Sequence, residues 1–173
     1  EDVSWVFTAG MKSDFPTLLA TADYRNDSDP LNIRLGNKDL RNLHYYDVNA
    51  NITFNGENEQ TISLSANYHR TDNQVAYALI FDKTTGASII YPTSVNGNWN
   101  TKFEVEFKRA LGKANKILFS NNSSTNYNHS VDMASIAGST ESQRSIVNNW
   151  EFGDELKVNY RLNDNYEFTF HTG

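Results

Sequence analysis

Apolar and polar residues alternate over long stretches of the chain, most clearly at 44–54. Because successive side chains of a β-strand point to opposite faces, this period of two predicts a strand with one apolar and one polar face. The apolar positions of this stretch are Tyr46, Val48, Ala50, Ile52 and Phe54, and the polar ones are Asp47, Asn49, Asn51 and Thr53. The same pattern predicts further strands at 61–68, 75–81, 89–92, 99–108, 116–131, 150–160 and 166–170.

The connections between these strands alternate in length. Short turns are predicted near 55–60, 111–115 and 162–165, whereas the excursions at 70–98 and 121–149 are long and polar. Within the excursions we expect a chain reversal at 82–86, a bulge or bend at Asn96-Gly97 and a polar loop at 132–142. Outer-membrane barrels have this asymmetry, with short periplasmic turns and long extracellular loops.

The pattern divides the chain at residue 43. Residues 1–43 are predicted to be an irregular lead-in with one short strand at 3–9, and residues 44–173 an antiparallel β-meander. Gly36 and Asn37 tolerate positive φ, so we expect a sharp reversal at this pair, just before the meander begins.

Residues 15–42 also carry a family resemblance. A turn of the form Gly-Asn-x-x-Leu, residues 36–40, follows Pro16-Thr17-Leu18-Leu19 and Asp29-Pro30-Leu31-Asn32-Ile33. Together with the alternating strand that comes next, it resembles the barrel region of TonB-dependent outer-membrane receptors, especially the related outer-membrane β-barrel family of Bacteroidetes. The family usually reads Gly-Asn-Pro-x-Leu-Lys-Pro; here Lys38 replaces the first Pro and Asn42 stands near the second, so the motif is partial.

The resemblance implies an all-β fold, an antiparallel meander that is a segment of an outer-membrane β-barrel. It further implies a place in the bacterial outer membrane, with lipid on the outer barrel face. The whole protein would take up a small nutrient ligand, using an inner-membrane energy-coupling complex that acts through a plug missing from this chain. The alternative from another class is a soluble β-sandwich at the cell surface that binds glycans or mediates adhesion.

Composition narrows the function classes. The 173 residues suffice for one domain with a core, and the absence of cysteine excludes disulfides, thiol nucleophiles and thiolate metal sites. A net charge of −6 without a Lys/Arg cluster argues against nucleic acid as a partner. The mean hydropathy of −0.62 excludes apolar membrane helices but not a barrel, whose strands alternate. The chain starts without Met and stops inside an alternating run, so we expect a fragment.

Two features bear on a lipid-facing surface. Asp154 lies in phase with the apolar positions of its strand, so either a bulge at Gly153 shifts the phase or this strand does not face lipid. Aromatic residues near the ends of the apolar stripes would suit interfacial girdles. They are Tyr46, Phe54, Tyr68, Trp99, Phe107, Tyr160 and Tyr166. If cut from a barrel, such stripes need cover, so the fragment is expected to curl into a closed sheet or to oligomerise.

No pattern of catalytic residues is present. The four histidines are scattered, and there is no nucleophile elbow, phosphate loop or dinucleotide fingerprint, so we expect neither an enzyme nor a cofactor or metal. If a surface binds a ligand, aromatic residues near loop tips with amide neighbours would suit sugars or peptides; the alternative is that these rings pack or form a girdle. The candidate contacts are Tyr91, Asn98, Trp99, Asn126 and Tyr127.

Overall fold

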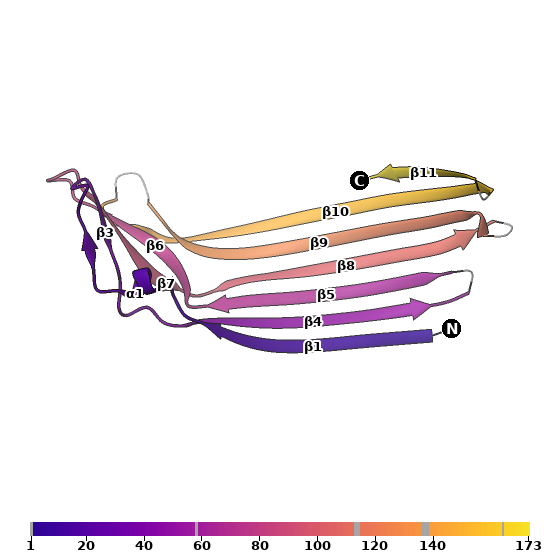
Figure 1. Ribbon diagram of the computed structural model, residues 1–173, viewed down its shortest axis with the longest axis horizontal. Coiled ribbons are helices and arrows are strands. Elements are labelled where there is room, and N and C mark those ends of the chain that lie inside the picture. The colour runs from indigo at the N-terminus through magenta and orange to yellow at the C-terminus, as the bar shows by residue number, and fades with distance from the viewer. Residues whose placement is uncertain (1, 58, 113–114, 136–138, 164) are drawn as a thin grey trace.

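A computed structural model describes residues 2–57, 59–112, 115–135, 139–163 and 165–173 (Figure 1). Residue 1 of the predicted lead-in, residues 58, 113, 114 and 164 of the predicted short turns and 136–138 of the predicted polar loop lie outside the described residues. The described part is all-β, with a helix of one turn and two sheets. The fold class predicted from the alternation is therefore confirmed at this level.

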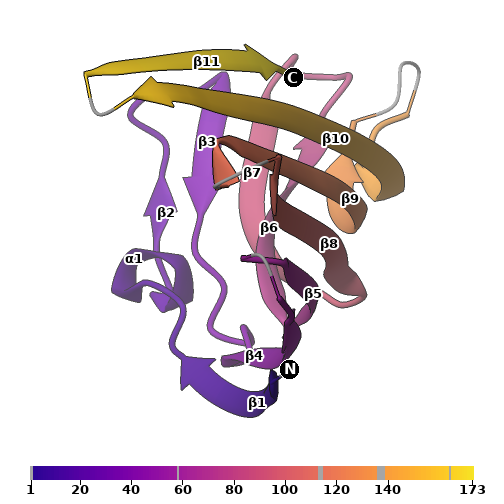
Figure 2. The ribbon, with the colours of Figure 1, turned by 90° about the vertical axis from the view of Figure 1, so that its right-hand side faces the viewer.

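The larger sheet has seven strands, each antiparallel to its neighbours, in the order β1-β4-β5-β8-β9-β10-β11. Figure 2, which looks along the strands, shows that this sheet bends into an arc with β1 and β11 at its two edges. Within the described residues the arc does not close into a barrel. Its strands are β1 (Asp2–Asp14), β4 (Leu43–Asn55), β5 (Thr61–Asp72), β8 (Asn98–Leu111), β9 (Ile117–Ala134), β10 (Gln143–Asn163) and β11 (Tyr166–Thr172).

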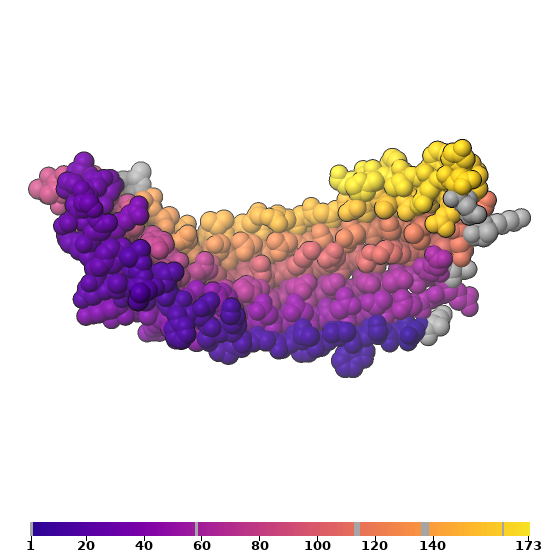
Figure 3. Space-filling view, viewed as in Figure 1, coloured from indigo at the N-terminus to yellow at the C-terminus, as the bar shows by residue number. Residues whose placement is uncertain are grey.

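The smaller sheet has four strands in the order β2-β3-β7-β6 and is mixed, because β3 runs parallel to β7. With the helix it forms a block at one end of the long sheet (Figures 1 and 3). Two sheets are consistent with a sandwich-like fold. The elements of this block are α1 (Leu18–Thr21), β2 (Arg25–Asn26), β3 (Asn32–Leu35), β6 (Gln74–Phe81) and β7 (Ser88–Val95).

The two sheets share chain segments. β5 continues into β6 through Asn73, which has φ 57°, and β7 continues into β8 through Asn96 and Gly97, where Gly97 has φ 106°. The two continuations cross. In the long sheet β5 lies next to β4 and β8 lies next to β9. In the small sheet the positions are exchanged: β6, which continues β5, packs toward β9, and β7, which leads into β8, pairs with β3. A small core of Ala76, Val95 and Val131 forms where they cross. The bend predicted at Asn96-Gly97 is confirmed.

The prediction for the lead-in is wrong in extent. The first strand covers 13 residues instead of 3–9, because all of β1 pairs with β4, from Asp2 opposite Asn55 to Asp14 opposite Leu43. Residues 15–42 are also less irregular than expected. Thr17 caps α1 by accepting a hydrogen bond from the Ala20 N–H, and β2 and β3 extend the small sheet. These pairings join distant segments, so a local pattern does not show them.

The reason given for Gly36 is also wrong. Neither Gly36 nor Asn37 has positive φ. A Cβ atom at Gly36 would instead overlap the carbonyl oxygen of Ala22 and lie 2.9 Å from the Tyr24 ring. Glycine is needed here for space, because the Gly36 N–H donates to the Tyr24 carbonyl at 3.1 Å and holds the two segments together.

The predicted alternation of connection lengths is confirmed only in part. The excursion predicted at 121–149 is wrong, because β9 and β10 pair through most of it, from Ala134 opposite Gln143 to Ile117 opposite Tyr160. Short connections at 56–60, 112–116 and 164–165 lie at one end of the long sheet, beside the chain's N-terminus (Figure 1). Long connections at 15–42 and 73–97 lie at the other end, with the 135–142 segment between β9 and β10.

Candidate functional site

The long sheet has an apolar face that is open to its surroundings. Residues opposite one another in the strand pairing point to the same face, and one such row runs Phe7–Ala50–Ala66–Phe103–Thr125–Phe152. Side chains of Trp5 and Phe152 are 74% and 79% exposed. We call this surface the apolar face; its apolar members include Val3, Trp5, Phe7, Met11, Tyr46, Val48, Ile52, Phe54, Ile62, Leu64, Tyr68, Trp99, Phe103, Val105, Phe107, Tyr127, Trp150 and Phe152.

The opposite face, here the polar face, is covered by amide, hydroxyl and charged side chains. They form hydrogen bonds between neighbouring strands: Asn122 Nδ2 donates to Glu104 Oε1 at 2.9 Å, and Asn126 Nδ2 to Glu151 Oε2 at 3.2 Å. Lys102 is 3.0 Å from Glu104 along its own strand. Many polar side chains of this face are therefore hydrogen-bonded to a neighbouring strand while they remain exposed to solvent.

A groove runs over the polar face. It is lined by Asn67, Asn100, Lys102, Asn126 and Glu151, with Gly153 beside them. A Cβ atom at Gly153 would lie 3.0 Å from Ser124 Oγ, so the missing side chain keeps the groove open. Amide and ionic groups at this spacing can offer both donors and acceptors to a polar ligand.

Aromatic rings gather in one band of the apolar face, near the end that carries the small sheet. Trp99 and Tyr127 have ring centroids 5.0 Å apart, Tyr127 and Trp150 4.6 Å, and Tyr68 and Trp99 6.0 Å. The Trp150 and Phe152 rings stack at 5.9 Å. We call these five residues, from β5, β8, β9 and β10, the aromatic belt. The Tyr127 hydroxyl donates to Asn148 Oδ1 at 2.9 Å, which leaves a polar edge beside apolar rings.

The structure brings together two of the five predicted ligand contacts. Trp99 and Tyr127 meet in the aromatic belt, but they lie within strands instead of at loop tips. Asn126 lies on the polar face beside Glu151. Asn98 is only 8% exposed and its side chain bonds the backbone of Val131. Tyr91 lies in β7, in the other sheet.

Sequence reasoning missed Trp150 and Phe152 as partners of this cluster. Their signal is the phase of the alternation, since each falls on the apolar parity of β10. Only the register of β10 against β9, which is not local in sequence, shows that Trp150 lies opposite Tyr127.

Asp154 lies on the apolar face, and the bulge predicted at Gly153 is wrong. The pairing of β10 with β9 is continuous from Gln143 to Tyr160, so the phase does not shift. The Asp154 carboxylate instead accepts hydrogen bonds from Ser123 Oγ at 2.6 Å and Asn121 Nδ2 at 3.0 Å. These side chains make a small polar patch in the apolar face.

The described residues contain no candidate metal site or membrane-spanning helix. Among the residues that the structure describes, no group of three or more His, Cys, Asp or Glu side chains could hold a metal ion. None of the described helices has the length and apolarity needed to cross a membrane. No family profile, curated protein or solved structure matches the chain. The two faces of the long sheet are therefore the features that bear on function.

Proposed function

We propose that this chain is part of the wall of an outer-membrane β-barrel, of the TonB-dependent-receptor type, that takes up a nutrient. In this proposal the apolar face contacts lipid and the polar face lines the interior. The chain supplies wall and loops and no catalytic residue. Energy coupling would belong to a plug and an inner-membrane complex outside this chain.

The observation that carries the proposal is the exposed apolar face. Burying one large apolar side chain is worth about 1.5–3 kcal/mol, so a face with Trp5, Phe7, Phe103 and Phe152 exposed in water is strongly unfavourable. Such a continuous patch is typical of an interaction or membrane surface. Lipid would cover it, while the hydrogen-bonded polar face would remain in water as a barrel interior does.

Two further observations support the same orientation. Judged by the ends of the described strands, the short connections lie at one end of the sheet and the long connections 15–42 and 73–97 at the other, as in barrels with short periplasmic turns and long extracellular loops. The aromatic belt lies toward the long-connection end, where a girdle at the outer membrane–water boundary would be.

Size-exclusion chromatography with light scattering, with and without a mild neutral detergent, tests the proposal. We expect the chain to bind detergent, or to form oligomers that detergent disperses. Phe103→Lys should reduce the bound detergent, whereas Glu104→Lys, one residue away on the other face, should not. A compact monomer that is indifferent to detergent, or equal detergent binding by the two variants, would refute a lipid-facing wall.

A second candidate, the soluble surface module that binds glycans, is favoured by one observation. The groove on the polar face offers Asn67, Asn100 and Asn126 beside Lys102 and Glu151, a set of donors and acceptors suited to sugar hydroxyls. This candidate predicts a detergent-indifferent monomer that binds oligosaccharides, with binding weakened by Asn126→Ala. Loss of solubility without detergent would count against it.

A further inference from the structure

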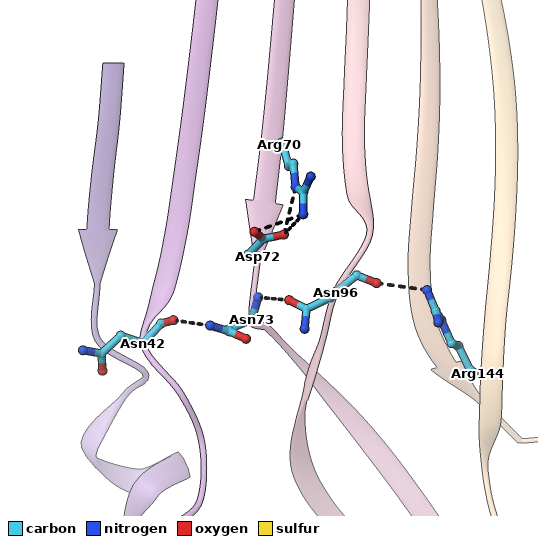
Figure 4. Close-up of polar contacts among 6 residues, drawn as sticks. All are labelled: Asn42, Arg70, Asp72, Asn73, Asn96 and Arg144. Carbon is cyan, nitrogen blue, oxygen red and sulfur yellow. Dashed lines mark hydrogen bonds and ion pairs between the residues drawn. The ribbon is translucent and has the colours of Figure 1, made fainter. Parts of the chain in front are cut away.

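Two arginines face a hollow where the long sheet meets the small one. The hollow is lined by Arg70 of β5, Arg144 of β10 and Met133 of β9, together with the end of β7 and the bend that follows it, residues 93–97. Figure 4 shows the polar contacts around it, with Arg70 and Arg144 coming from opposite sides of the bend. Basic side chains are sparse in this chain of net charge −6, which makes a pair in one hollow notable.

Both arginines belong to the apolar face. Arg70 lies opposite Tyr46 on one side and Trp99 on the other, so it stands beside the aromatic belt. Arg144 lies opposite Met133, with the same parity as Trp150 of the belt. The hollow is therefore a basic site at the edge of an exposed apolar surface.

The fold holds Arg144 in place. Its guanidinium donates to the Asn96 carbonyl at 3.1 Å. Asn96 also accepts, through Oδ1, a hydrogen bond from the Asn73 N–H at 2.6 Å (Figure 4). A Cβ atom at Gly97 would lie 3.2 Å from Arg144, so glycine makes room for the guanidinium. The carbonyl partner does not neutralise the charge of Arg144.

Arg70 has an acidic partner. Its Nε and Nη2 donate to Asp72 at 3.0 and 3.2 Å, and about half of the Arg70 side chain is exposed. Two guanidinium groups and one carboxylate leave a net positive charge in the hollow. The hydroxyl of Ser94, also in the lining, accepts from the Arg41 N–H at 3.3 Å, which puts a third arginine's backbone at the rim.

We propose that this hollow binds the phosphate group of an anionic amphiphile, with the acyl chains lying on the apolar face. Arginine's planar donors match phosphate oxygens, and hydroxyl groups such as Ser94 can add a further hydrogen bond. The continuous apolar surface next to the hollow favours an amphiphile over a free anion. The amphiphile as source rests on the proposed function; the arginine pair as an anion site does not.

The test measures lipid retained by the protein in neutral detergent micelles. Micelles are mixed with phosphatidylglycerol or, as a neutral comparison, phosphatidylcholine, and lipid phosphorus is quantified after size exclusion. We expect preference for phosphatidylglycerol, weakened on the order of tenfold or more by combined Arg70→Gln and Arg144→Gln. Arg109→Gln is the matched control, since Arg109 of β8 also belongs to the apolar face but lies at the opposite end of the sheet from the hollow.

Asp72→Asn gives a second readout that a purely structural role would not produce. Removing this competing carboxylate should tighten binding of phosphatidylglycerol, whereas loss of structure would weaken it. Unchanged binding in the double arginine variant, or no gain in Asp72→Asn, would overturn the proposal. Inorganic phosphate that binds through the arginines while lipid retention ignores them would overturn the amphiphile. Detergent binding without lipid preference refutes this site alone; binding of neither detergent nor lipid refutes the proposed function as well.

Discussion

The side chain of Asn98 is predicted to contribute strongly to the stability of the long sheet. It stands one residue beyond the last β8–β9 pair, Trp99 with His129. Its side chain continues the ladder in place of backbone: Nδ2 donates to the Val131 carbonyl at 3.2 Å, and Oδ1 accepts from the Val131 N–H at 2.7 Å. Val131 is 1% exposed, so water cannot easily replace these two bonds.

Asn98→Ala should therefore leave two buried backbone groups without a partner. Each such group costs about 1–3 kcal/mol, so we expect the free energy of unfolding to fall by about 2–6 kcal/mol. For a chain of this size that corresponds to a fall in Tm on the order of 4–24 °C.

Urea unfolding followed by tryptophan fluorescence, in a fixed detergent concentration, measures this loss as a lower midpoint at constant m. Asn100→Ala is the control, because Asn100 is an exposed residue on the same strand and the same face. We expect the control to stay within about 0.5 kcal/mol of wild type. If Asn98→Ala matches the control, the side chain does not carry the ladder and the reasoning fails.

Two other predictions concern the long connections. Gly36→Ala should lower the unfolding midpoint, since its Cβ would overlap the Ala22 carbonyl; Gly10→Ala, with nothing within 4 Å, should not, and equal effects would contradict the steric argument. Hydrogen bonds from Thr85 and from the backbone lower the pKa of Asp82 below its ordinary 3.8, so the stability that they give the 82–87 turn is full above that pH and is lost as the pH falls through the lowered pKa. The protection factors for amide hydrogen exchange at the turn, which compare each rate with the intrinsic rate at the same pH, should fall on acidification in wild type but not in Asp82→Asn, and parallel pH profiles would refute this.

The sequence predicted those parts of the fold that depend on residues close together in the chain, and missed those that depend on the pairing of distant segments. Alternation is local, so it placed β4, β5, β8 and the turns between long strands. The parallel pairing of Ile33 with Ile89 joins segments far apart, and no local period reveals it. The same limit explains the length of β1, whose second half has no alternation of its own and is held by β4.

The candidate site shows the same limit at the level of side chains. An asparagine beside an aromatic residue is compatible with a ligand contact or with a backbone partner, and only the register showed that Asn98 bonds Val131. Arg70 falls on the apolar parity of β5, after Tyr68, so the sequence held a signal that the apolar stripe changes character there. The position of Arg144 in the same hollow as Arg70 could not be predicted, because the crossing of β6 and β7 brings the two residues together.

The crossing also determines where this chain can change in length. An extra residue within 82–87 lies beyond Phe81 and Ser88, the last pair of the hairpin, and leaves every register intact. An extra residue at Gly97 would shift β8 by one position, turning Phe103 to the polar face and Glu104 to the apolar one. Two extra residues would restore the faces. Natural insertions are thus expected in any number of residues at the tip of this connection, 82–87, but only two residues at a time at its base near Gly97.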